Sequence, residues 1–146
     1  MDTNKQILLV EDEPIIRDMY EMILKKKGYQ IDLAEDGETA LNKITQAPEK
    51  YSLILLDIML PKVDGITVLK KIKQPDSAAK DIPVFLLTNL GQENLIKEAM
   101  ALGAIQYWIK SNIFPMDLVK EIENFNTADS TTSSAPEATP DTNPAS

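Results

Sequence analysis

Five short apolar runs, each followed by a segment whose apolar residues recur at helical spacing, constrain the fold more than any other feature of this sequence. The runs are KQILLV, YQIDLA, SLILLD, PVFLLT and IQYWIK, at residues 5–10, 29–34, 52–57, 83–88 and 105–110. Runs of this kind are typical of parallel strands that are buried on both faces. The sequence therefore predicts an α/β fold, in which helices cover both faces of a five-stranded parallel sheet.

Helix signals separate the predicted strands. Helices are expected over residues 13–28, after Asp36, from the Asp64–Gly65 pair, over residues 92–103 and over residues 115–125. Pro14 and Pro115 stand in first turns, where the missing N–H of proline does no harm. Gly28 supplies a stop signal, and the lysines before it complement the helix dipole. Each strand is thus followed by a helix, as in a doubly wound sheet.

Composition excludes several classes of protein. The chain has no Cys and no His, which rules out a disulfide framework, thiolate or imidazole metal sites, and a phosphohistidine carried by this chain. Its formal charge of −8 argues against direct DNA binding, which needs a basic face. No apolar run approaches the roughly 18 residues of a membrane span, and the N-terminus lacks the features of a secretory signal. We therefore expect a cytoplasmic protein.

The end of the sequence differs in character from the rest. Residues 127–146 contain three prolines, three acids and many Ser and Thr, but no Lys or Arg. Such a segment cannot bury enough apolar surface to offset the entropy of ordering it. We expect one folded domain over residues 1–126 and a disordered, Ser/Thr/Pro-rich acidic tail over residues 127–146.

Polar residues that can bind ions or take part in reactions follow the ends of the apolar runs. They are Glu11, Asp12 and Glu13 after the first run, Asp57 after the third, Thr88 after the fourth and Lys110 after the fifth. The carboxyl ends of parallel strands lie on one edge of the sheet, so these side chains are expected to converge there. We expect Asp57 to emerge at the end of its strand rather than to be buried.

A cluster of Glu11, Asp12 and Asp57 needs a cation, because neighbouring carboxylates repel and raise one another's pKa. The available ligands are all oxygens, which favours a hard divalent ion, and Mg²⁺ also accepts phosphoryl oxygens. Thr88 adds a hydrogen-bond donor and Lys110 a positive charge, and both suit a phosphoryl group in transfer. The sequence therefore predicts a magnesium-dependent phosphoryl site.

Four motifs in order, LLVEDEP, LLDIMLPKVDG, LLT and GAIQYWIK, resemble those of the receiver domain of two-component response regulators. The resemblance covers residues 5–126. It implies a flavodoxin-like fold with strand order 2-1-3-4-5 and five helices. It also implies a phosphorylation-controlled switch, not a turnover enzyme, with a histidine kinase or phosphotransfer protein as donor and an unknown protein as target. Pairing with a second copy after phosphorylation is a further implication.

The resemblance also implies roles for individual residues at the acidic site. Asp57 would accept the phosphoryl group. Asp12 and Asp57 would bind Mg²⁺ directly, with the backbone carbonyl of Met59 as third protein ligand and Glu11 acting through water.

A second set of implied roles concerns the response to phosphorylation. Lys110 would pair with the acceptor carboxylate and then with the phosphate. Thr88 would bond a phosphoryl oxygen, and its movement would let Tyr107 rotate inward. That motion would change the face built from the fourth helix and the fifth strand, the usual output surface of the family.

The sequence departs from the family pattern near the site. Ser111 replaces the usual Pro, so the loop after Lys110 is either trans or strained. Asn89 is larger than the residue that commonly follows the conserved Thr. Met59 and Leu90 provide apolar bulk but no group to orient water, so we expect slow hydrolysis of the acylphosphate.

Other functions on a similar fold remain as alternatives. One alternative is a receiver-like interaction or scaffold module, and another is a phosphorelay intermediate without a phosphorylation-dependent output of its own. A flavodoxin is disfavoured because EDEPII would repel a flavin phosphate, and no P-loop motif is present. Phosphatases of the haloacid dehalogenase type need a second Asp where this chain has Met59.

Overall fold

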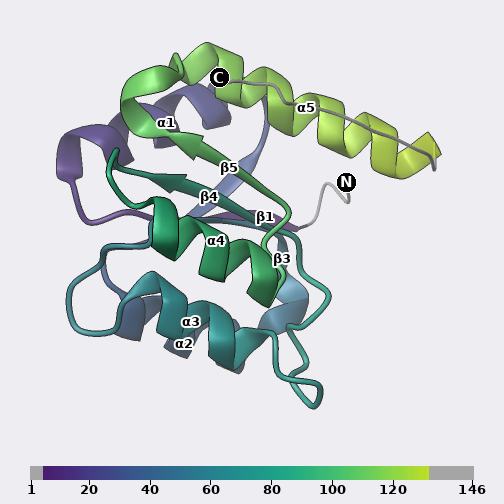
Figure 1. The fold of residues 1–146 in the computed structure, drawn as a ribbon. Coiled ribbons are helices and arrows are strands. Elements are labelled where there is room, and N and C mark those ends of the chain that lie inside the picture. The colour runs from purple at the N-terminus through teal and green to yellow at the C-terminus, as the bar shows by residue number, and fades with distance from the viewer. Residues whose placement is uncertain (1–4, 132–146) are drawn as a thin grey trace.

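The computed structural model describes residues 5–131, and the side chains of residues 5–126. Its core is a parallel sheet in the order β2-β1-β3-β4-β5 (Figure 1). The strands are β1 (Gln6–Val10), β2 (Gln30–Ala34), β3 (Tyr51–Leu56), β4 (Val84–Thr88) and β5 (Gln106–Ile109). The predicted doubly wound sheet and its strand order are confirmed.

Five α-helices cover the two faces of the sheet in the described part of the chain (Figure 1). On one face lie α1 (Pro14–Lys26) and α5 (Pro115–Thr131). On the other lie α2 (Gly37–Gln46), α3 (Gly65–Ile72) and α4 (Glu93–Leu102). Short 3₁₀ helices span Pro48–Lys50 (η1) and Lys110–Asn112 (η2). Among the described residues, no helix combines the length and apolarity that crossing a bilayer requires.

The last helix is longer than the sequence pattern suggested. We expected it to end at residue 125, but α5 continues to Thr131. Neither Gly nor Pro occurs between Pro115 and Pro136, so the sequence contains no strong stop signal at the predicted end. Residues 127–131 of the predicted tail are therefore helical, and residues 132–146 lie outside the described part of the chain.

The central strand β3 shows why the apolar runs are continuous. Leu53 and Leu55 pack in the core under α1 and α5, whereas Ile54 and Leu56 pack in the core under α2, α3 and α4. All four side chains are fully buried. A strand with a core on each side has no polar face, and so it loses the alternation of a half-exposed strand.

Backbone hydrogen bonds continue past the ends of the strands and position the residues that follow. Glu11 N–H donates to the carbonyl of Ala34 at 3.0 Å, and Asp57 N–H donates to the carbonyl of Val10 at 3.2 Å. Glu11 and Asp57 thus remain tied to the sheet although each lies just beyond its strand. Both side chains start from the same edge of the sheet.

Two glycines allow the β3–α3 loop to pack closely. Gly65 N–H donates to the carbonyl of Ile58 at 2.7 Å, and Gly37 N–H donates to the carbonyl of Pro61 at 3.3 Å. A Cβ added at Gly37 would lie 1.6 Å from the carbonyl oxygen of Val63. The start of α2 therefore supports the loop that follows Asp57.

Candidate functional site

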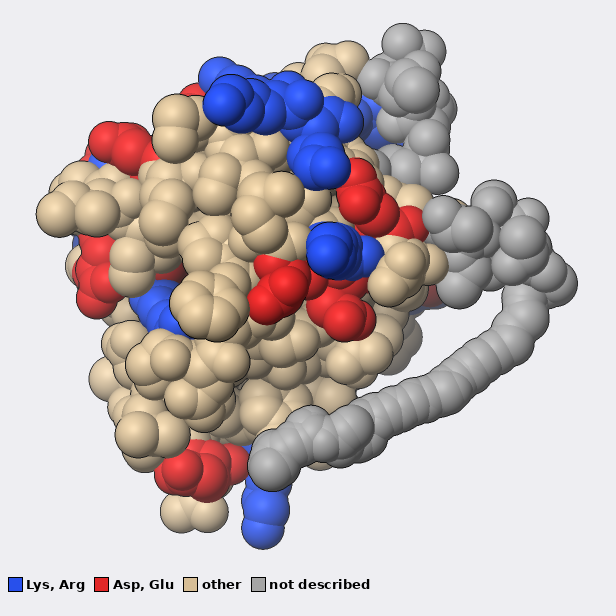
Figure 2. Space-filling view, turned by 90° about the horizontal axis from the view of Figure 1, so that it is seen from above, with Lys and Arg blue, Asp and Glu red and all other residues tan. Residues whose placement is uncertain are grey.

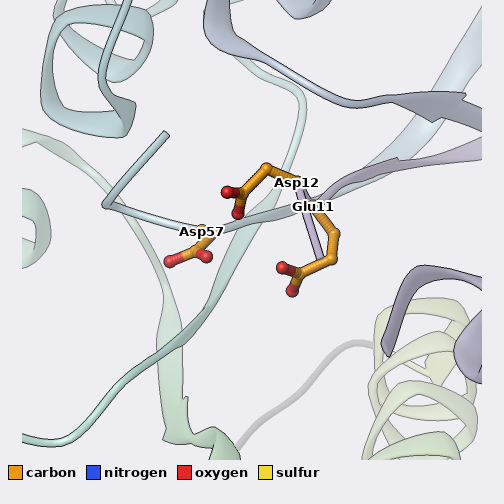
Figure 3. Close-up of side chains that lie close together, drawn as sticks. All are labelled: Glu11, Asp12 and Asp57. Carbon is orange, nitrogen blue, oxygen red and sulfur yellow. The ribbon is translucent and has the colours of Figure 1, made fainter. Parts of the chain in front are cut away.

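Three carboxylates meet at the carboxyl edge of the sheet. Glu11 and Asp12 follow β1, Asp57 follows β3, and one oxygen from each lies within 4.8 Å of the others. Figure 3 shows these side chains gathered at the ends of the two strands. Glu11 and Asp57 are buried, whereas Asp12 is partly exposed. The cluster is thus open to solvent on the side of Asp12.

The expectation that Asp57 emerges from the interior is wrong, because its side chain is only 1% exposed. Lys110 compensates its charge. The Lys110 ammonium donates to Asp57 Oδ2 at 2.8 Å and lies 2.8 Å from Glu11 Oε1. The N–H of Met59 donates to Asp57 Oδ1 at 3.3 Å. Burial of the carboxylate is possible because Lys110, from a distant part of the chain, and the adjacent Met59 N–H both bond to it.

The electrostatics of the cluster favour a second cation. Burial raises the pKa of Glu11, although the hydrogen bond from Lys110 opposes this shift. Burial alone would lower the pKa of Lys110, but its bonds to Asp57 and Glu11 outweigh burial and raise it. The ammonium therefore stays charged at neutral pH. With Asp12 included, three carboxyl groups gather around one ammonium, so the acidic groups outnumber the cation that compensates them.

The donor set fits Mg²⁺. It consists of carboxylate oxygens on converging side chains, one of them partly exposed, and contains neither sulfur nor imidazole. Mg²⁺ is bound in proteins through one or two carboxylates, waters and substrate phosphates. Asp12 and Asp57 stand where they would hold such an ion, and buried Glu11 would act behind them. The ligand role of the Met59 carbonyl stays a prediction.

Thr88, the last residue of β4, carries an unpartnered hydroxyl. Its side chain is fully buried, and Thr88 Oγ1 makes no hydrogen bond within the described residues. A buried hydroxyl without a partner costs about 1–3 kcal/mol, so such groups are rare without a functional reason. Tyr107 lies on neighbouring β5, opposite Leu86 in the register, and its side chain is 47% exposed.

The loop after β5 accommodates Ser111 without a cis bond. No peptide bond among the described residues is cis, so the Lys110–Ser111 bond is trans. The sequence pattern indicated that Lys110 ends the fifth strand. In the structure β5 ends at Ile109, and Lys110 begins the 3₁₀ helix η2. The Ser111 substitution therefore leaves the contacts of Lys110 with Asp57 and Glu11 in place.

Sequence reasoning missed two exposed apolar side chains in the loops and helix starts at this edge. Ile15 in the first turn of α1 is 83% exposed, and Phe114 before α5 is 77% exposed. Both stand beside other apolar residues in the sequence, so the local pattern does not mark them as exposed. Helical phase was the available signal for Ile15, because neighbouring Ile16 packs against the core under α1 and α5.

Charged groups on the α1–α5 side of the molecule are mixed in sign. Figure 2 shows acidic groups next to basic ones, and a broad area without charged groups beside them. Two lysines near the end of α1 have acidic partners: Lys25 Nζ lies 2.8 Å from Glu21, and Lys27 Nζ lies 4.0 Å from Glu123. Two of the three lysines at residues 25–27 thus pair with acids.

Comparisons with known proteins show the family to which the chain belongs. The family model described as the response regulator receiver domain matches residues 7–123. The chain is 36% identical over 119 residues to a chemotaxis protein CheY of Treponema pallidum, and the aligned region covers 81% of this chain and 78% of that protein. It is 35% identical over 118 residues to sporulation initiation phosphotransferase F of Bacillus subtilis, covering 81% and 90%. The structure of a CheX–CheY–BeF3–Mg complex from Borrelia burgdorferi matches with a TM-score of 0.73 and 28% identity, covering 84% of this chain and 89% of that one.

Proposed function

Because the chain belongs to the family of response regulator receiver domains, we propose that it is a signalling switch that accepts a phosphoryl group on Asp57. The donor is a phosphohistidine on a partner kinase or phosphotransfer protein. The observation that carries the proposal is the buried Asp57 carboxylate, held 2.8 Å from Lys110 and clustered with Glu11 and Asp12. An isolated carboxylate does not stay buried, and this one has partners suited to phosphoryl chemistry.

In the proposed transfer, an oxygen of Asp57 attacks phosphorus and the P–N bond of the phosphohistidine breaks. The imidazole leaves with the electron pair of that bond and is protonated from solvent. Lys110 holds Asp57 Oδ2. Oδ1 is bonded, among the described residues, only to the Met59 N–H at 3.3 Å, and it is therefore the candidate attacking atom. Bound Mg²⁺ would offset the repulsion between the acceptor and the incoming phosphoryl oxygens.

The same residues give the switch its physical basis. A phosphoryl group adds negative charge and acceptor oxygens at one point. Lys110, which bonds Asp57 now, would pair with one of these oxygens. Thr88, whose hydroxyl has no partner among the described residues, would donate to another. Movement of Thr88 would leave space for Tyr107, now half exposed, to turn inward. The target protein would read this change on α4 and β5.

Intact-mass analysis tests the acceptor. After exposure to Mg²⁺ and acetyl phosphate, we expect the wild-type chain to gain one phosphoryl group and Asp57→Asn to gain none. Asp32→Asn is the matched control, because Asp32 lies within β2 and its carboxylate also pairs with a lysine, Lys43, at 2.7 Å. This control should be labelled like the wild type. Equal labelling of wild type and Asp57→Asn would refute the assignment, and absence of label, also with a phosphorylated kinase as donor, would favour the scaffold alternative.

The phosphorylated state should be long-lived. Met59 is 48% and Leu90 66% exposed, and neither side chain can orient an attacking water. Met59→Asn is expected to speed loss of the phosphoryl group about tenfold, below the 10²–10⁴ range of a positioned general base. Decay of the phosphorylated mass after removal of the donor measures this. Met22→Asn, the same change at a residue 57% exposed on α1, should leave the decay unaltered. An unchanged rate in Met59→Asn would contradict this explanation.

A second candidate function is relay of the phosphoryl group to another histidine. The similarity to sporulation initiation phosphotransferase F, 90% of whose length is covered, favours it. A long-lived acylphosphate would suit such a relay. Incubation of the phosphorylated chain with a histidine phosphotransfer protein distinguishes the two: a relay moves the label onto that protein, whereas a terminal switch keeps it until hydrolysis.

A further inference from the structure

We infer that Arg17 is a positioning residue for the acidic site, which aims the carboxylate of Asp12 by holding the peptide group that precedes it. Arg17 is the only arginine in the sequence and lies in the first part of α1. Its Nη1 donates a hydrogen bond of 3.0 Å to the main-chain carbonyl of Glu11. The inference rests on the proposed magnesium site and adds a residue to it.

The carbonyl of Glu11 belongs to the peptide group that joins Glu11 to Asp12. This group is planar and includes the Cα of Asp12. A hydrogen bond that holds its oxygen therefore also restrains the position of that Cα. On the other side of Glu11, its N–H is held by the carbonyl of Ala34 at 3.0 Å. Glu11 is therefore tied to β2 at its nitrogen and to α1 at its carbonyl, just where the chain leaves the sheet.

Asp12 depends on this backbone because no residue in the described part of the chain holds its side chain. Within the described residues, the Asp12 carboxylate makes no hydrogen bond and no ion pair, in contrast to Asp57 and Glu11, which Lys110 holds. A ligand whose side chain is free can be oriented only through its main chain. Outer partners that orient metal ligands typically contribute 10–100-fold to metal affinity.

The choice of partner by Arg17 also indicates a positioning role. A guanidinium binds best to a carboxylate through two parallel hydrogen bonds. Among residues 5–126, Arg17 has no carboxylate oxygen within 4.0 Å, although Asp18 is its neighbour and Glu13 lies one helical turn earlier. It bonds a neutral carbonyl instead. The side chain therefore acts on the path of the main chain more than on the charge of the site.

Positioning and simple electrostatics predict opposite effects of removing Arg17. A positive charge beside a cation site repels the cation, so electrostatics alone predicts tighter Mg²⁺ binding in Arg17→Ala. Loss of the carbonyl hydrogen bond predicts weaker binding, because the Asp12 main chain is released. The sign of the change in affinity therefore decides between the two roles.

Titration calorimetry of the full chain with Mg²⁺ alone is the test. We expect Arg17→Ala to weaken binding about tenfold or more. Arg17→Lys, which keeps the charge and one donor but not the planar fork, should fall between Arg17→Ala and the wild type. Lys26→Ala, which removes one positive charge from an exposed position on the same helix, should bind like the wild type or slightly more tightly.

Phosphorylation supplies a second readout. In Arg17→Ala the Mg²⁺ concentration for half-maximal phosphorylation should rise by the same factor, while the rate at saturating Mg²⁺ stays close to that of the wild type, because Asp57 and Lys110 are retained. Unchanged or tighter Mg²⁺ binding by Arg17→Ala would overturn the inference. If that variant does not fold, Arg17→Lys decides: weaker binding than the wild type supports the role, and equal binding overturns it. Failure of the wild type to bind Mg²⁺ or to be phosphorylated would refute the proposed function itself.

Discussion

Replacing Gly65 with alanine is expected to slow phosphorylation of Asp57 about a hundredfold and to lower the free energy of unfolding by about 1–3 kcal/mol. A Cβ at this position would lie 2.3 Å from the carbonyl oxygen of Asp57 and 2.7 Å from the Cα of Ile58. Both are main-chain atoms, which cannot rotate aside as a flexible side chain would. The segment that carries the acceptor must therefore move.

The size of the effect follows from the contact that Gly65 makes. Its N–H donates to the carbonyl of Ile58 at 2.7 Å, so the start of α3 lies directly against the residues after β3. A displacement of about 1 Å in a positioned reactive group is enough to reduce a rate about a hundredfold. The hydrogen bonds from Lys110 and Met59 to Asp57 would be distorted by the same movement.

Gly28→Ala provides the control for stability. Gly28 has φ +97° and no atom within 4 Å of its Cβ position, so alanine there is strained by its backbone alone. Gly28 lies between α1 and β2, at the opposite edge of the sheet from Asp57. We expect a comparable loss of stability in denaturant unfolding and a wild-type rate of phosphorylation. Equal rates for Gly65→Ala and the wild type, or equal slowing in both variants, would contradict the explanation.

The parts of this fold that the sequence predicted depend on local pattern and on parallel topology. The apolar run that ends at Leu56 is continuous because β3 has a core on each side. The point where such a run stops therefore indicates where the strand ends. Because all strands are parallel, the residues after them had to meet at one edge. Asp12, Asp57 and Lys110 were found in this way.

Burial of Asp57 could not be predicted from local pattern. An acid at the end of an apolar run is compatible with an exposed strand end and with a buried ion pair. The choice depends on Lys110, which lies 53 positions away in the sequence. The hydrogen bond of Arg17 to the Glu11 carbonyl was missed for a related reason, because a side-chain contact with the main chain has no sequence signature.

Lys110→Met is expected to destabilise the protein by about 3–5 kcal/mol at neutral pH, the usual cost of removing one partner from a buried ion pair. The ammonium lies 2.8 Å from both Asp57 Oδ2 and Glu11 Oε1, and its own side chain is only 8% exposed. Without it, two buried carboxylates face each other and lack a cation. Phosphorylation of Asp57 should also be lost. Unfolding in denaturant and the intact-mass assay measure the two effects.

The destabilisation should depend on pH in a definite direction. Burial already raises the pKa of Glu11 above its ordinary value of 4.5, and Lys110 opposes this, so the variant should raise that pKa further. A carboxyl with a raised pKa in the folded state holds its proton more tightly when folded. Stability is therefore recovered as pH falls from neutral toward 4.5 and lost again as pH rises. A loss that is constant over this interval would show that packing, not charge, is responsible.

Magnesium offers the sharpest test, because the ion would replace the missing ammonium. If the carboxylates bind Mg²⁺, saturating ion should raise the midpoint of thermal unfolding more in Lys110→Met than in the wild type. Asp57→Asn combined with Lys110→Met removes one of the two facing charges, and should be more stable than Lys110→Met alone while responding less to Mg²⁺.

Lys62→Met is the matched control: Lys62 is 61% exposed and pairs at 3.7 Å with Asp36, so its loss should cost about 1 kcal/mol or less and leave the response to Mg²⁺ unchanged. An equal response to Mg²⁺ in the wild type and Lys110→Met would mean that the ion and the ammonium do not compensate the same buried charges.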